Sequence, residues 1–268
     1  MELEAGKAAV VTGGGSGIGA ALCQAFAQRG MSVAVSDIDL AAAEGVAQAI
    51  SSAGGRAIAT KTDVSSRESV KALADEAFAA FGGVHVLCNN AGVVAFRGAA
   101  EMGDADWDWV MSVNLGGVVN GVTQFLPRMI EQGGEAHIVN TASIAGLFAT
   151  PGMASYVASK QAVVGLSEHL RADLAEIGIG VSVLCPGGVA TRIVEAGRNR
   201  PSEHGGPEEI PDQAAGIRQG IAAGMPPEQV AERVLNAVRE NELFIVTHED
   251  TRAGAVARLE GIRAAYAG

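Results

Sequence analysis

Aromatic side chains are scarce in this sequence: Phe, Trp and Tyr make up only 4% of its 268 residues. A core without many rings must be packed with small and branched aliphatic side chains. The 36 glycines predict tight turns and closely approaching backbones. Charged residues are also few, at 18%, whereas 48% of the residues are hydrophobic, which excludes a disordered or fibrous chain. A chain of this length can form one large α/β domain.

Positive charge is in short supply as well. Lys and Arg number 19 against 30 Asp and Glu, which gives a net charge of −11. A nucleic-acid-binding protein carries a basic surface, and this composition does not offer one. The acidic excess is more simply explained as a contribution to solubility. We therefore expect no nucleic-acid partner.

Cysteine is rare, and the three present are Cys23, Cys88 and Cys185. They lie in apolar or strand-like segments without paired spacing, which is typical of buried, reduced thiols in an intracellular protein. No uninterrupted apolar run approaches membrane-spanning length, and residues 1–4 lack the basic start of a signal peptide. We therefore expect a cytoplasmic protein without a membrane partner.

Histidine and tryptophan do not form a pattern that indicates chemistry. Trp107 and Trp109 begin a predicted helix, and we expect them to pack rather than to bind. The histidines share no helical face and no ligand spacing, so we expect no metal site. They are His85, His137, His169, His204 and His248.

Short runs rich in β-branched residues alternate with longer helical patterns along most of the chain. The runs predict strands at 8–11, 32–36, 56–59, 84–88, 137–140, 181–185 and 243–246. The segments between them predict helices at 17–29, 40–53, 66–81, 104–132, 152–177 and 227–240. This alternation predicts a single α/β domain over residues 1–268, with a doubly wound parallel sheet of about seven strands and helices on both faces.

The segment 191–226 is the least regular part of the sequence. Long irregular segments inside compact domains are often functional, and we interpret this one as a lid over a substrate site. Arg192, Arg198 and Arg200 could bind a carboxylate there, although a solvated lid surface is the simpler interpretation. After the last predicted strand, residues 247–268 form a C-terminal extension with a helical pattern.

A glycine-rich stretch, residues 12–19, joins the first predicted strand to the first helix. Glycines let the backbone approach a pyrophosphate, whose charge suits a helix N-terminus. Eighteen residues after Gly19, Asp37 ends the second strand, where a carboxylate can bind the adenosine ribose and repel a 2′-phosphate. Asp39 could take that role instead. Because the glycine stretch contains no Lys or Arg, the sequence favours NAD (NADH) over NADP.

Two further polar stretches follow predicted strands. Asp63 and Val64 come after the third strand, where they can reach an adenine ring. Residues 89–92, with the sequence Asn-Asn-Ala-Gly, come after the fourth strand. Open α/β sheets bind ligands at the carboxyl ends of their strands, so these residues are expected at the same site as the glycine-rich stretch.

Tyr156 and Lys160 stand four residues apart on a predicted helix, and Ser143 lies thirteen positions before the tyrosine. Residues i and i+4 share a helical face, so the phenol and the ammonium can point into the same site. A cation beside a phenol lowers its pKa, which suits acid/base work on an alcohol or a ketone. Taken alone, the pair is explained equally well without any function, as an exposed tyrosine and a solvated lysine on a helix surface.

These motifs together resemble the short-chain dehydrogenase/reductase family, in order and spacing, over residues 8–191. The residues that carry the resemblance lie in the stretches 12–19, 89–92 and 186–191 and at Asp63, Asn114, Ser143, Tyr156 and Lys160. The resemblance implies a Rossmann fold and a catalytic tetrad. In this tetrad Tyr156 is the acid/base, Ser143 binds the substrate oxygen, Lys160 lowers the pKa of the tyrosine, and Asn114 holds a water that links Lys160 to solvent.

The resemblance also implies which residues contact the cofactor. The backbone of Val189 and the hydroxyl of Thr191 would hold the nicotinamide carboxamide, and Lys160 would bind the nicotinamide ribose. The complete implied set is Gly13, Ser16, Gly17, Ile18, Gly19, Asp37, Ile38, Asp63, Val64, Asn90, Ala91, Gly92, Tyr156, Lys160, Pro186, Gly187, Val189 and Thr191.

From their positions relative to the motifs, we predict a mostly apolar set of residues that contact the substrate. Each of them is equally compatible with core packing. The set is Val94, Phe96, Ser143, Ile144, Leu147, Phe148, Met153, Gly188, Ile193 and Val194. The long 191–226 segment and the C-terminal extension differ from typical 3-oxoacyl carrier-protein reductases. They look like members of the family that act on bulky, apolar secondary alcohols or ketones, such as aryl or steroidal ones.

We therefore predict an NAD-dependent oxidoreductase that interconverts a hydrophobic secondary alcohol and its ketone. A 3-oxoacyl thioester reductase, acting on acyl-carrier-protein or CoA substrates, is the alternative enzyme. A non-catalytic dinucleotide-binding regulator is the alternative of another class, and it could dispense with Ser143, Tyr156 or Lys160. The resemblance further implies a homodimer or homotetramer assembled through the predicted helices 104–132 and 152–177.

Overall fold

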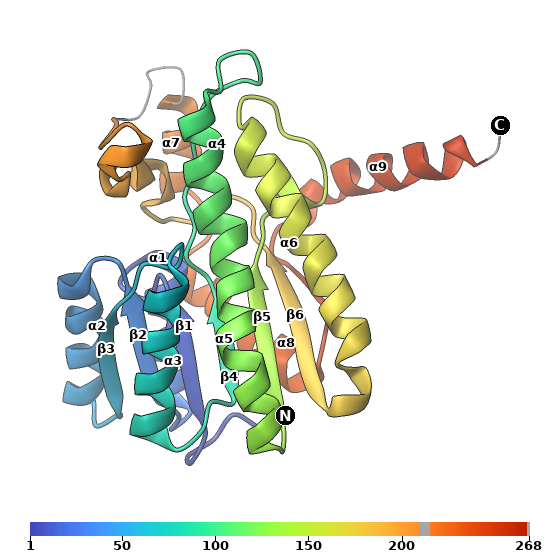
Figure 1. Cartoon of the computed structure of the whole chain (residues 1–268). Helices are drawn as coiled ribbons and strands as arrows, with labels where there is room; N and C mark the ends of the chain where they lie inside the picture. Colours follow the sequence, from blue (N-terminus) through green and yellow to red (C-terminus); the bar gives the residue numbers. More distant parts are fainter. Residues whose placement is uncertain (210–214, 267–268) are drawn as a thin grey trace.

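The computed structural model describes residues 1–209 and 215–266 (Figure 1). Within these ranges seven parallel strands form one sheet in the order β3-β2-β1-β4-β5-β6-β7. The strands are β1 (Ala8–Thr12), β2 (Ser32–Asp37), β3 (Ala57–Lys61), β4 (Val86–Asn89), β5 (Ala136–Thr141), β6 (Ile179–Cys185) and β7 (Phe244–Val246). The strand order reverses between β1 and β4, so the predicted doubly wound sheet is confirmed and its switch point lies between these two strands.

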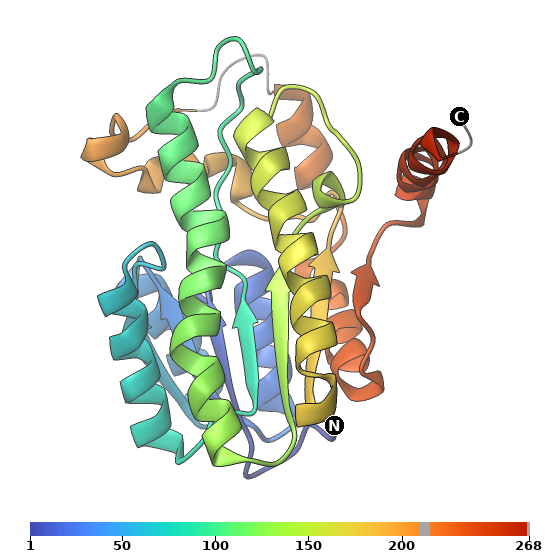
Figure 2. The same ribbon diagram turned by 45° about the vertical axis from the view of Figure 1, so that its right-hand side comes forward.

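Helices cover both faces of the sheet (Figures 1 and 2). They are α1 (Gly17–Gln28), α2 (Leu40–Ser52), α3 (Arg67–Phe81), α4 (Asp104–Met111), α5 (Gly117–Gln132), α6 (Ala154–Asp173), α7 (Ala215–Ala222), α8 (Pro227–Glu240) and α9 (Arg252–Ala265). Successive strand residues point to opposite faces, so Val11 packs with α1, α2 and α8, whereas its neighbour Val10 packs with α3, α5 and α6. A single strand therefore contributes side chains to both core layers.

Small side chains allow the helices to approach the sheet closely, as the composition predicts. Gly121 of α5 shows this most clearly, because a Cβ placed on it would lie 2.0 Å from Oδ1 of Asn89 at the end of β4. Asn89 in turn donates a hydrogen bond to Oδ1 of Asn140 on β5 at 2.9 Å. The glycine thus leaves room for a buried polar contact beneath the ligand edge of the sheet.

The predicted helix 104–132 is not one regular helix. A π-helical turn, Ser112–Gly116, joins α4 to α5 and contains the buried Asn114. Such turns insert an extra residue into a helix and are frequent at functional sites. Apolar periodicity could not reveal this turn, because it continues through both α-helical parts. The predicted helix 152–177 also ends early, since α6 stops at Asp173 and a 3₁₀ turn, Ala175–Ile177, follows.

The predicted lid contains more regular structure than its composition indicates. It includes 3₁₀ turns at Ile193–Asn199 and Ser202–His204 as well as α7, while residues 210–214 lie outside the described part.

The C-terminal extension follows β7 and passes through a 3₁₀ turn, Glu249–Thr251, into α9, and residues 267–268 lie outside the described part. Both views show α9 leaving the body of the molecule (Figures 1 and 2). None of the helices described here is long and apolar enough to cross a membrane.

Candidate active site

A cavity of about 640 Å³ opens at the carboxyl edge of the sheet. Loops that follow β1, β3, β4, β5 and β6 line it, and the lid segment with α7 covers one side. This is the position at which open α/β sheets bind ligands, beside the switch point between β1 and β4. The sequence motifs that lie far apart along the chain therefore meet in one place.

The glycine-rich stretch forms the floor of the cavity, and at Gly13 and Gly17 there is no space for a side chain. Gly13 has φ +64°, and a Cβ placed on it would lie 2.9 Å from the Cα of Ala91. Gly17 has φ +52°, and its Cβ would lie 2.9 Å from Cγ2 of Thr191. The floor ends at the N-terminus of α1, where free backbone N–H groups and the helix dipole favour an anion. These features fit the pyrophosphate of a dinucleotide.

The carboxylate of Asp37 faces this floor, and that of Asp39 does not. Asp37 ends β2, lines the cavity and accepts a hydrogen bond from the backbone N–H of Gly15 at 2.9 Å. Asp39 is the N-cap of α2, and its side chain accepts from the N–H of Ala42 at 3.2 Å. Of the two acids, only Asp37 borders the cavity.

Thr12 connects the glycine-rich floor to the loop after β4. Its hydroxyl oxygen accepts hydrogen bonds from the backbone N–H groups of Asn90 at 3.0 Å and Ala91 at 3.1 Å. The side chain of Asn90 donates back to the carbonyl of Thr12 at 3.0 Å. The two loops are thus held in one fixed relation at the switch point of the sheet.

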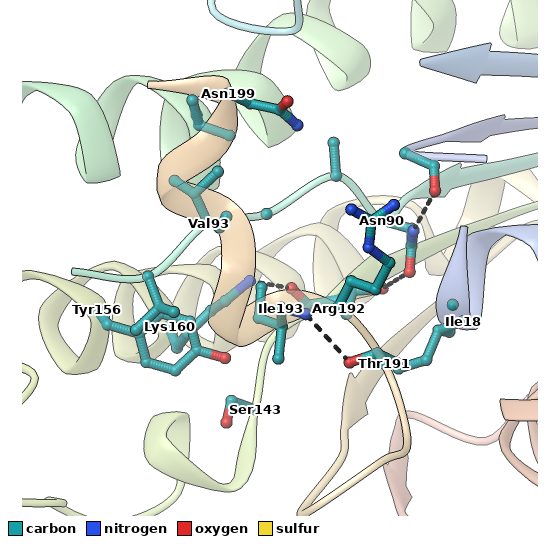
Figure 3. Close-up of a pocket in the computed structure, with 18 of the residues that line it drawn as sticks. Ile18, Asn90, Val93, Ser143, Tyr156, Lys160, Thr191, Arg192, Ile193 and Asn199 are labelled. Carbon is teal, nitrogen blue, oxygen red and sulfur yellow. Dashed lines mark hydrogen bonds between the residues drawn. The ribbon is translucent and has the colours of Figure 1, made fainter. Parts of the chain in front are cut away.

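Ser143, Tyr156 and Lys160 gather on one side of the cavity, across from Ile18 and Thr191 (Figure 3). Ser143 follows β5 and caps a short 3₁₀ turn, Ile144–Gly146, by accepting from the N–H of Ala145 at 3.2 Å. Tyr156 and Lys160 both come from α6, as their spacing predicts. The lysine Nζ lies 5.6 Å from the centroid of the tyrosine ring.

Burial sets the protonation of this group. Lys160 is 2% exposed, and burial lowers its pKa to about 8, while its Nζ donates to the carbonyl of Thr141 at 2.8 Å. Burial raises the pKa of Tyr156 above its ordinary value, and the Ser143 hydroxyl opposes this shift. Loss of solvent is thus the larger effect on the pKa of the phenol, and the predicted lowering of that pKa by Lys160 stays a prediction.

Asn114 lies behind the cavity wall and is fully buried in the π-helical turn. Its amide donates to the carbonyl of Val93 at 2.9 Å and to Oγ of Ser159 at 3.1 Å, and it accepts from the N–H of Val93 at 2.8 Å. A Cβ on Gly92 would lie 3.4 Å from both Asn114 Oδ1 and Lys160 Nζ. Asn114 thus braces the wall beside Lys160, and its predicted role in holding a water stays a prediction.

All eighteen residues of the predicted cofactor set border the cavity. Of the predicted substrate set, Val94, Phe96, Ser143, Ile144, Met153, Gly188 and Ile193 border it too. The other three lie elsewhere. Leu147 packs against an apolar cluster that includes Val163, the ring of Phe148 packs against Gly254 of α9, and Val194 is buried within the lid itself.

The sequence interpretation missed several residues that border the cavity. Trp109 of α4, 2% exposed, was expected only to pack, yet it also borders the cavity, where it packs against Ala196 of the lid. Ile217 and Ile221 of α7 lie at the cavity as well. Their spacing of four residues on one helical face was the available signal, but the irregular composition around them concealed the helix.

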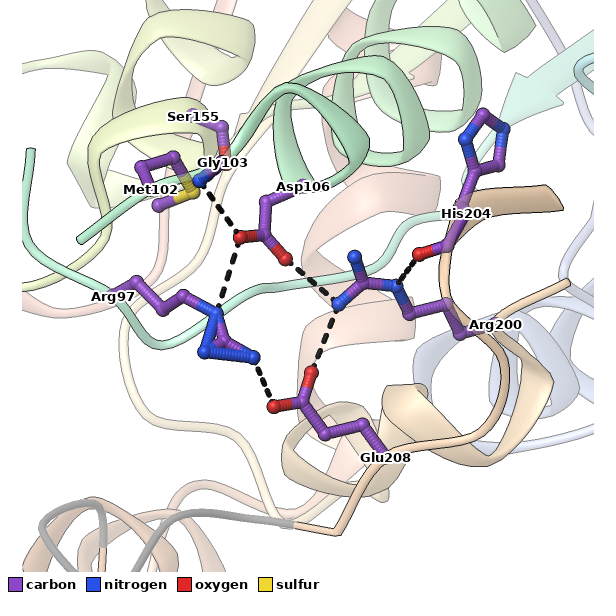
Figure 4. A network of polar contacts seen from close by, with 8 residues as sticks. All are labelled: Arg97, Met102, Gly103, Asp106, Ser155, Arg200, His204 and Glu208. Atoms are coloured by element: carbon purple, nitrogen blue, oxygen red, sulfur yellow. Dashed lines mark hydrogen bonds and ion pairs between the residues drawn. The ribbon is translucent and has the colours of Figure 1, made fainter. Parts of the chain in front are cut away.

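A partly buried ionic network joins the lid to the body (Figure 4). Arg200 of the lid is 7% exposed and pairs with Asp106 of α4 at 2.7 Å and with Glu208 at 2.9 Å. Arg97, from the loop after β4, pairs with Asp106 at 3.1 Å and also contacts Glu208. The guanidinium of Arg200 lies 5.3 Å from the ring centroid of Trp109. The interpretation of Arg200 as part of a solvated lid surface is therefore wrong, because two carboxylates and a ring enclose it.

The histidines have contacts of other kinds. In the part of the chain that the structure describes, no group of three or more His, Cys, Asp and Glu side chains could hold a metal ion. His169 pairs with Asp173 on the exposed face of α6, and His137 hydrogen-bonds Oγ of Ser182 inside the sheet. His248 contacts the backbone of Gly187 and Gly188 at the cavity edge.

Comparison with known proteins agrees with this geometry. A family described as short chain dehydrogenase matches residues 7–201. C alpha-dehydrogenase from Sphingobium sp. (strain NBRC 103272 / SYK-6) is 34% identical over 259 residues, which cover 96% of this chain and 85% of that protein. 3beta-hydroxysteroid dehydrogenase 2 from Eggerthella lenta is 36% identical over 228 residues, 85% of each chain. A crystal structure of a short chain dehydrogenase/reductase from Burkholderia phymatum in complex with NAD has a TM-score of 0.93 and 41% identity, covering 98% of this chain and 96% of that chain.

Proposed function

Because this chain belongs to the short-chain dehydrogenase family, we propose that it uses NAD to interconvert a bulky, hydrophobic secondary alcohol and its ketone. The observation that carries this proposal is the meeting of Ser143, Tyr156 and Lys160 in the cavity whose floor is the glycine-rich stretch. A non-catalytic dinucleotide-binding protein could dispense with these three side chains. Their convergence on one cavity favours an enzyme.

The tyrosine and the serine would act on the substrate oxygen. In ketone reduction, Tyr156 would give its hydroxyl proton to that oxygen, and the raised pKa of Tyr156 keeps the proton available at neutral pH. The hydroxyl of Ser143 would donate a hydrogen bond to the same oxygen and stabilise its developing negative charge. When bound, the nicotinamide would supply the hydride chemistry. In alcohol oxidation the protonated Lys160, beside the ring, would favour the phenolate that Tyr156 has to become.

Asp37 supports NAD rather than NADP. Its carboxylate borders the cavity at the end of β2, where it would accept hydrogen bonds from the adenosine ribose and repel a 2′-phosphate. Arg198 also borders the cavity, but its guanidinium donates to the carbonyls of Arg192 and Glu195 within the lid. The NAD complex of the Burkholderia phymatum protein, 41% identical to this chain, is consistent with the same preference.

Apolar side chains around the proposed reaction centre support a hydrophobic substrate. Val94 and Phe96 come from the loop after β4, Met153 from the start of α6, and Ile193 and Ile217 from the lid side. Two relatives carry the names C alpha-dehydrogenase and 3beta-hydroxysteroid dehydrogenase 2. Aryl carbinols and hydroxysteroids are therefore the first substrates to test.

Assembly and location belong to the same proposal. We propose a homodimer or homotetramer formed through α5 and α6, which light scattering on the purified protein would reveal as two or four times the chain mass of 27.1 kDa. A cytoplasmic location agrees with Cys23, Cys88 and Cys185, which are buried and unpaired with one another.

An assay of NADH formation tests the proposed function. The protein is incubated with NAD or with NADP and a panel of aliphatic, aryl and steroidal secondary alcohols, and with 3-hydroxyacyl thioesters in parallel. We expect NAD-linked oxidation of a bulky apolar alcohol. Preference for NADP with the thioesters would replace the proposal by the 3-oxoacyl thioester reductase, and dinucleotide binding without turnover of any class would favour a regulator.

A further inference from the structure

We propose that His248 of the C-terminal extension is a positioning residue for the nicotinamide end of the site. Its neutral imidazole would fix the backbone of residues 187–188 and thereby the neighbouring Val189 and Thr191. The inference rests on the proposed function and on the role that the family resemblance implies for these last two residues, which is to hold the nicotinamide carboxamide. It assigns to the extension a role in cofactor binding that its place beyond the last strand does not suggest.

The hydrogen bonds of His248 define its tautomer. Nε2 lies 2.9 Å from the carbonyl oxygen of Gly188, and because a carbonyl only accepts, Nε2 must carry the proton. The backbone N–H of Gly187 donates to Nδ1 at 3.1 Å, so this second nitrogen must present its lone pair. The hydroxyl oxygen of Thr247 lies 2.7 Å from the same Nδ1. A neutral ring with its proton on Nε2 satisfies both backbone contacts.

The fit between the ring and the loop is close. A Cβ placed on Gly187 would lie 2.6 Å from Cγ of His248, so only glycine leaves space for the imidazole at this point. Thr247, 2% exposed, anchors the extension just before the histidine. His248 itself is half-buried, and the next residue in the sequence, Glu249, is exposed. Its position is therefore determined by packing as well as by hydrogen bonds.

Residues 186–190 are braced from three sides, and His248 supplies one of them. The N–H of Ile144, next to Ser143, donates to the carbonyl of Pro186 at 3.0 Å. Met225, at the end of the lid, donates its N–H to the carbonyl of Gly188 at 2.9 Å and accepts from the N–H of Ala190 at 3.0 Å. The Gly188 carbonyl thus receives donors from both the lid and the extension. Loss of His248 would free the side of this loop that the extension holds.

The test compares binding of NADH with binding of ADP-ribose, which lacks the nicotinamide. Titration calorimetry on the full chain would be carried out for wild type, His248→Phe and His248→Gln. Phe keeps the ring volume without hydrogen bonds, whereas Gln keeps one donor and one acceptor. Glu249→Gln, an exposed neighbour in the same segment, is the matched control. We expect the NADH Kd of His248→Phe to rise about tenfold, with ADP-ribose affinity changed by less than about twofold.

Partial recovery of NADH affinity in His248→Gln, with Glu249→Gln unchanged, completes the expected pattern. The inference is overturned if NADH and ADP-ribose weaken equally in His248→Phe, because that result indicates general loss of structure. It is also overturned if neither ligand weakens, or if Gln is as poor as Phe. If wild type binds neither ligand, the proposed function fails and the inference fails with it.

Discussion

Burial determines the proton chemistry of the site at the scale of single residues. Lys160 loses solvent on every side, which lowers its pKa to about 8, and the same loss of solvent raises the pKa of Tyr156. Both shifts favour the neutral form of the group concerned. The phenol is therefore held as a proton donor, and the lysine becomes the part of the site that is most sensitive to mildly alkaline pH.

Lys160 should make stability depend on pH in a predictable direction. Its pKa falls from 10.5 to about 8 on folding, so between these values the unfolded chain binds more protons than the native one. The free energy of unfolding contributed by this residue therefore rises with pH across that range. Urea unfolding of wild type and Lys160→Met at about pH 7 and about pH 10 measures this effect. We expect the free energy of unfolding of Lys160→Met, relative to that of wild type, to be lower at about pH 10 than at about pH 7. A difference in unfolding free energy that does not change with pH would contradict the burial argument.

Asp37 should set the cofactor preference. Removing its carboxylate in Asp37→Ala deletes charge-assisted hydrogen bonds to the ribose and the repulsion of a 2′-phosphate, so the NAD over NADP preference should fall roughly tenfold or more. The Kd values of both dinucleotides measure this ratio. Asp39→Ala is the matched control, because it removes the α2 cap at a cost of about 1 kcal/mol in stability. A change of ratio in the control, or none in Asp37→Ala, would argue against the assignment.

At the scale of elements, the lid is connected to the body by ion pairs as well as by apolar contacts. Arg200 and Glu208 belong to the lid, whereas Asp106 lies in the first turn of α4 and Arg97 precedes that helix. The same lid carries Ile193 and Ile217 to the cavity wall. The position of this apolar wall therefore depends on a partly buried charge network that lies away from the reacting groups.

Replacement of Arg200 by Met should disturb substrate binding more than cofactor binding. The change leaves the buried Asp106 with one cation fewer, and breaking such a pair costs roughly 3 kcal/mol of unfolding free energy. We expect a raised KM for a bulky alcohol with a nearly unchanged Kd for NADH. Arg239→Met is the matched control, because its pair with Glu2 is exposed and spans 3.8 Å. Equal effects of the two variants would show that the network does not position the lid.

Two helical glycines should respond to alanine with opposite signs. Gly121→Ala brings a methyl group onto Asn89, so stability should fall by about 1–3 kcal/mol. Gly45 of α2 is exposed and has open space at its Cβ position, so Gly45→Ala should raise stability by up to about 1 kcal/mol through helix propensity. Denaturant unfolding distinguishes the two. Equal signs would contradict the close approach of α5 to β4.

Local patterns predicted the sheet, and they picked out residues that border one cavity. Strand and helix alternation, together with the glycine-rich stretch, depends on neighbouring residues, and these features were recovered. The failures depend on contacts between distant segments. Phe148 packs on Gly254, and Arg200 is enclosed by Asp106, neither of which a local pattern could reveal. The π-helical turn at Asn114 leaves the apolar periodicity on both sides intact, so it was equally hidden.

At the scale of the whole molecule, residues from most of the chain meet at the carboxyl edge of the sheet, and the C-terminal extension also reaches this edge. The motifs occupy residues 12–191, while Ile217 from the lid and His248 from the extension reach the same edge. Beyond His248, α9 leaves the body of the molecule and carries the exposed Leu259, and the exposed Tyr266 follows its last residue (Figures 1 and 2). The extension therefore has one part at the site, through His248, and another that contacts the body near Gly254 and is exposed at Leu259.

The most direct test of the account is transfer of deuterium from NADH labelled at C4 of the nicotinamide to a bulky apolar ketone. Mass spectrometry of the recovered secondary alcohol measures the label at the carbinol carbon, for wild type and for Tyr156→Phe. We predict labelled alcohol with wild type, a rate lowered about a thousandfold in Tyr156→Phe, and equal NADH binding by both. Equal label transfer by Tyr156→Phe, or NADH binding without transfer to any ketone of an aryl and steroidal panel, would contradict the account.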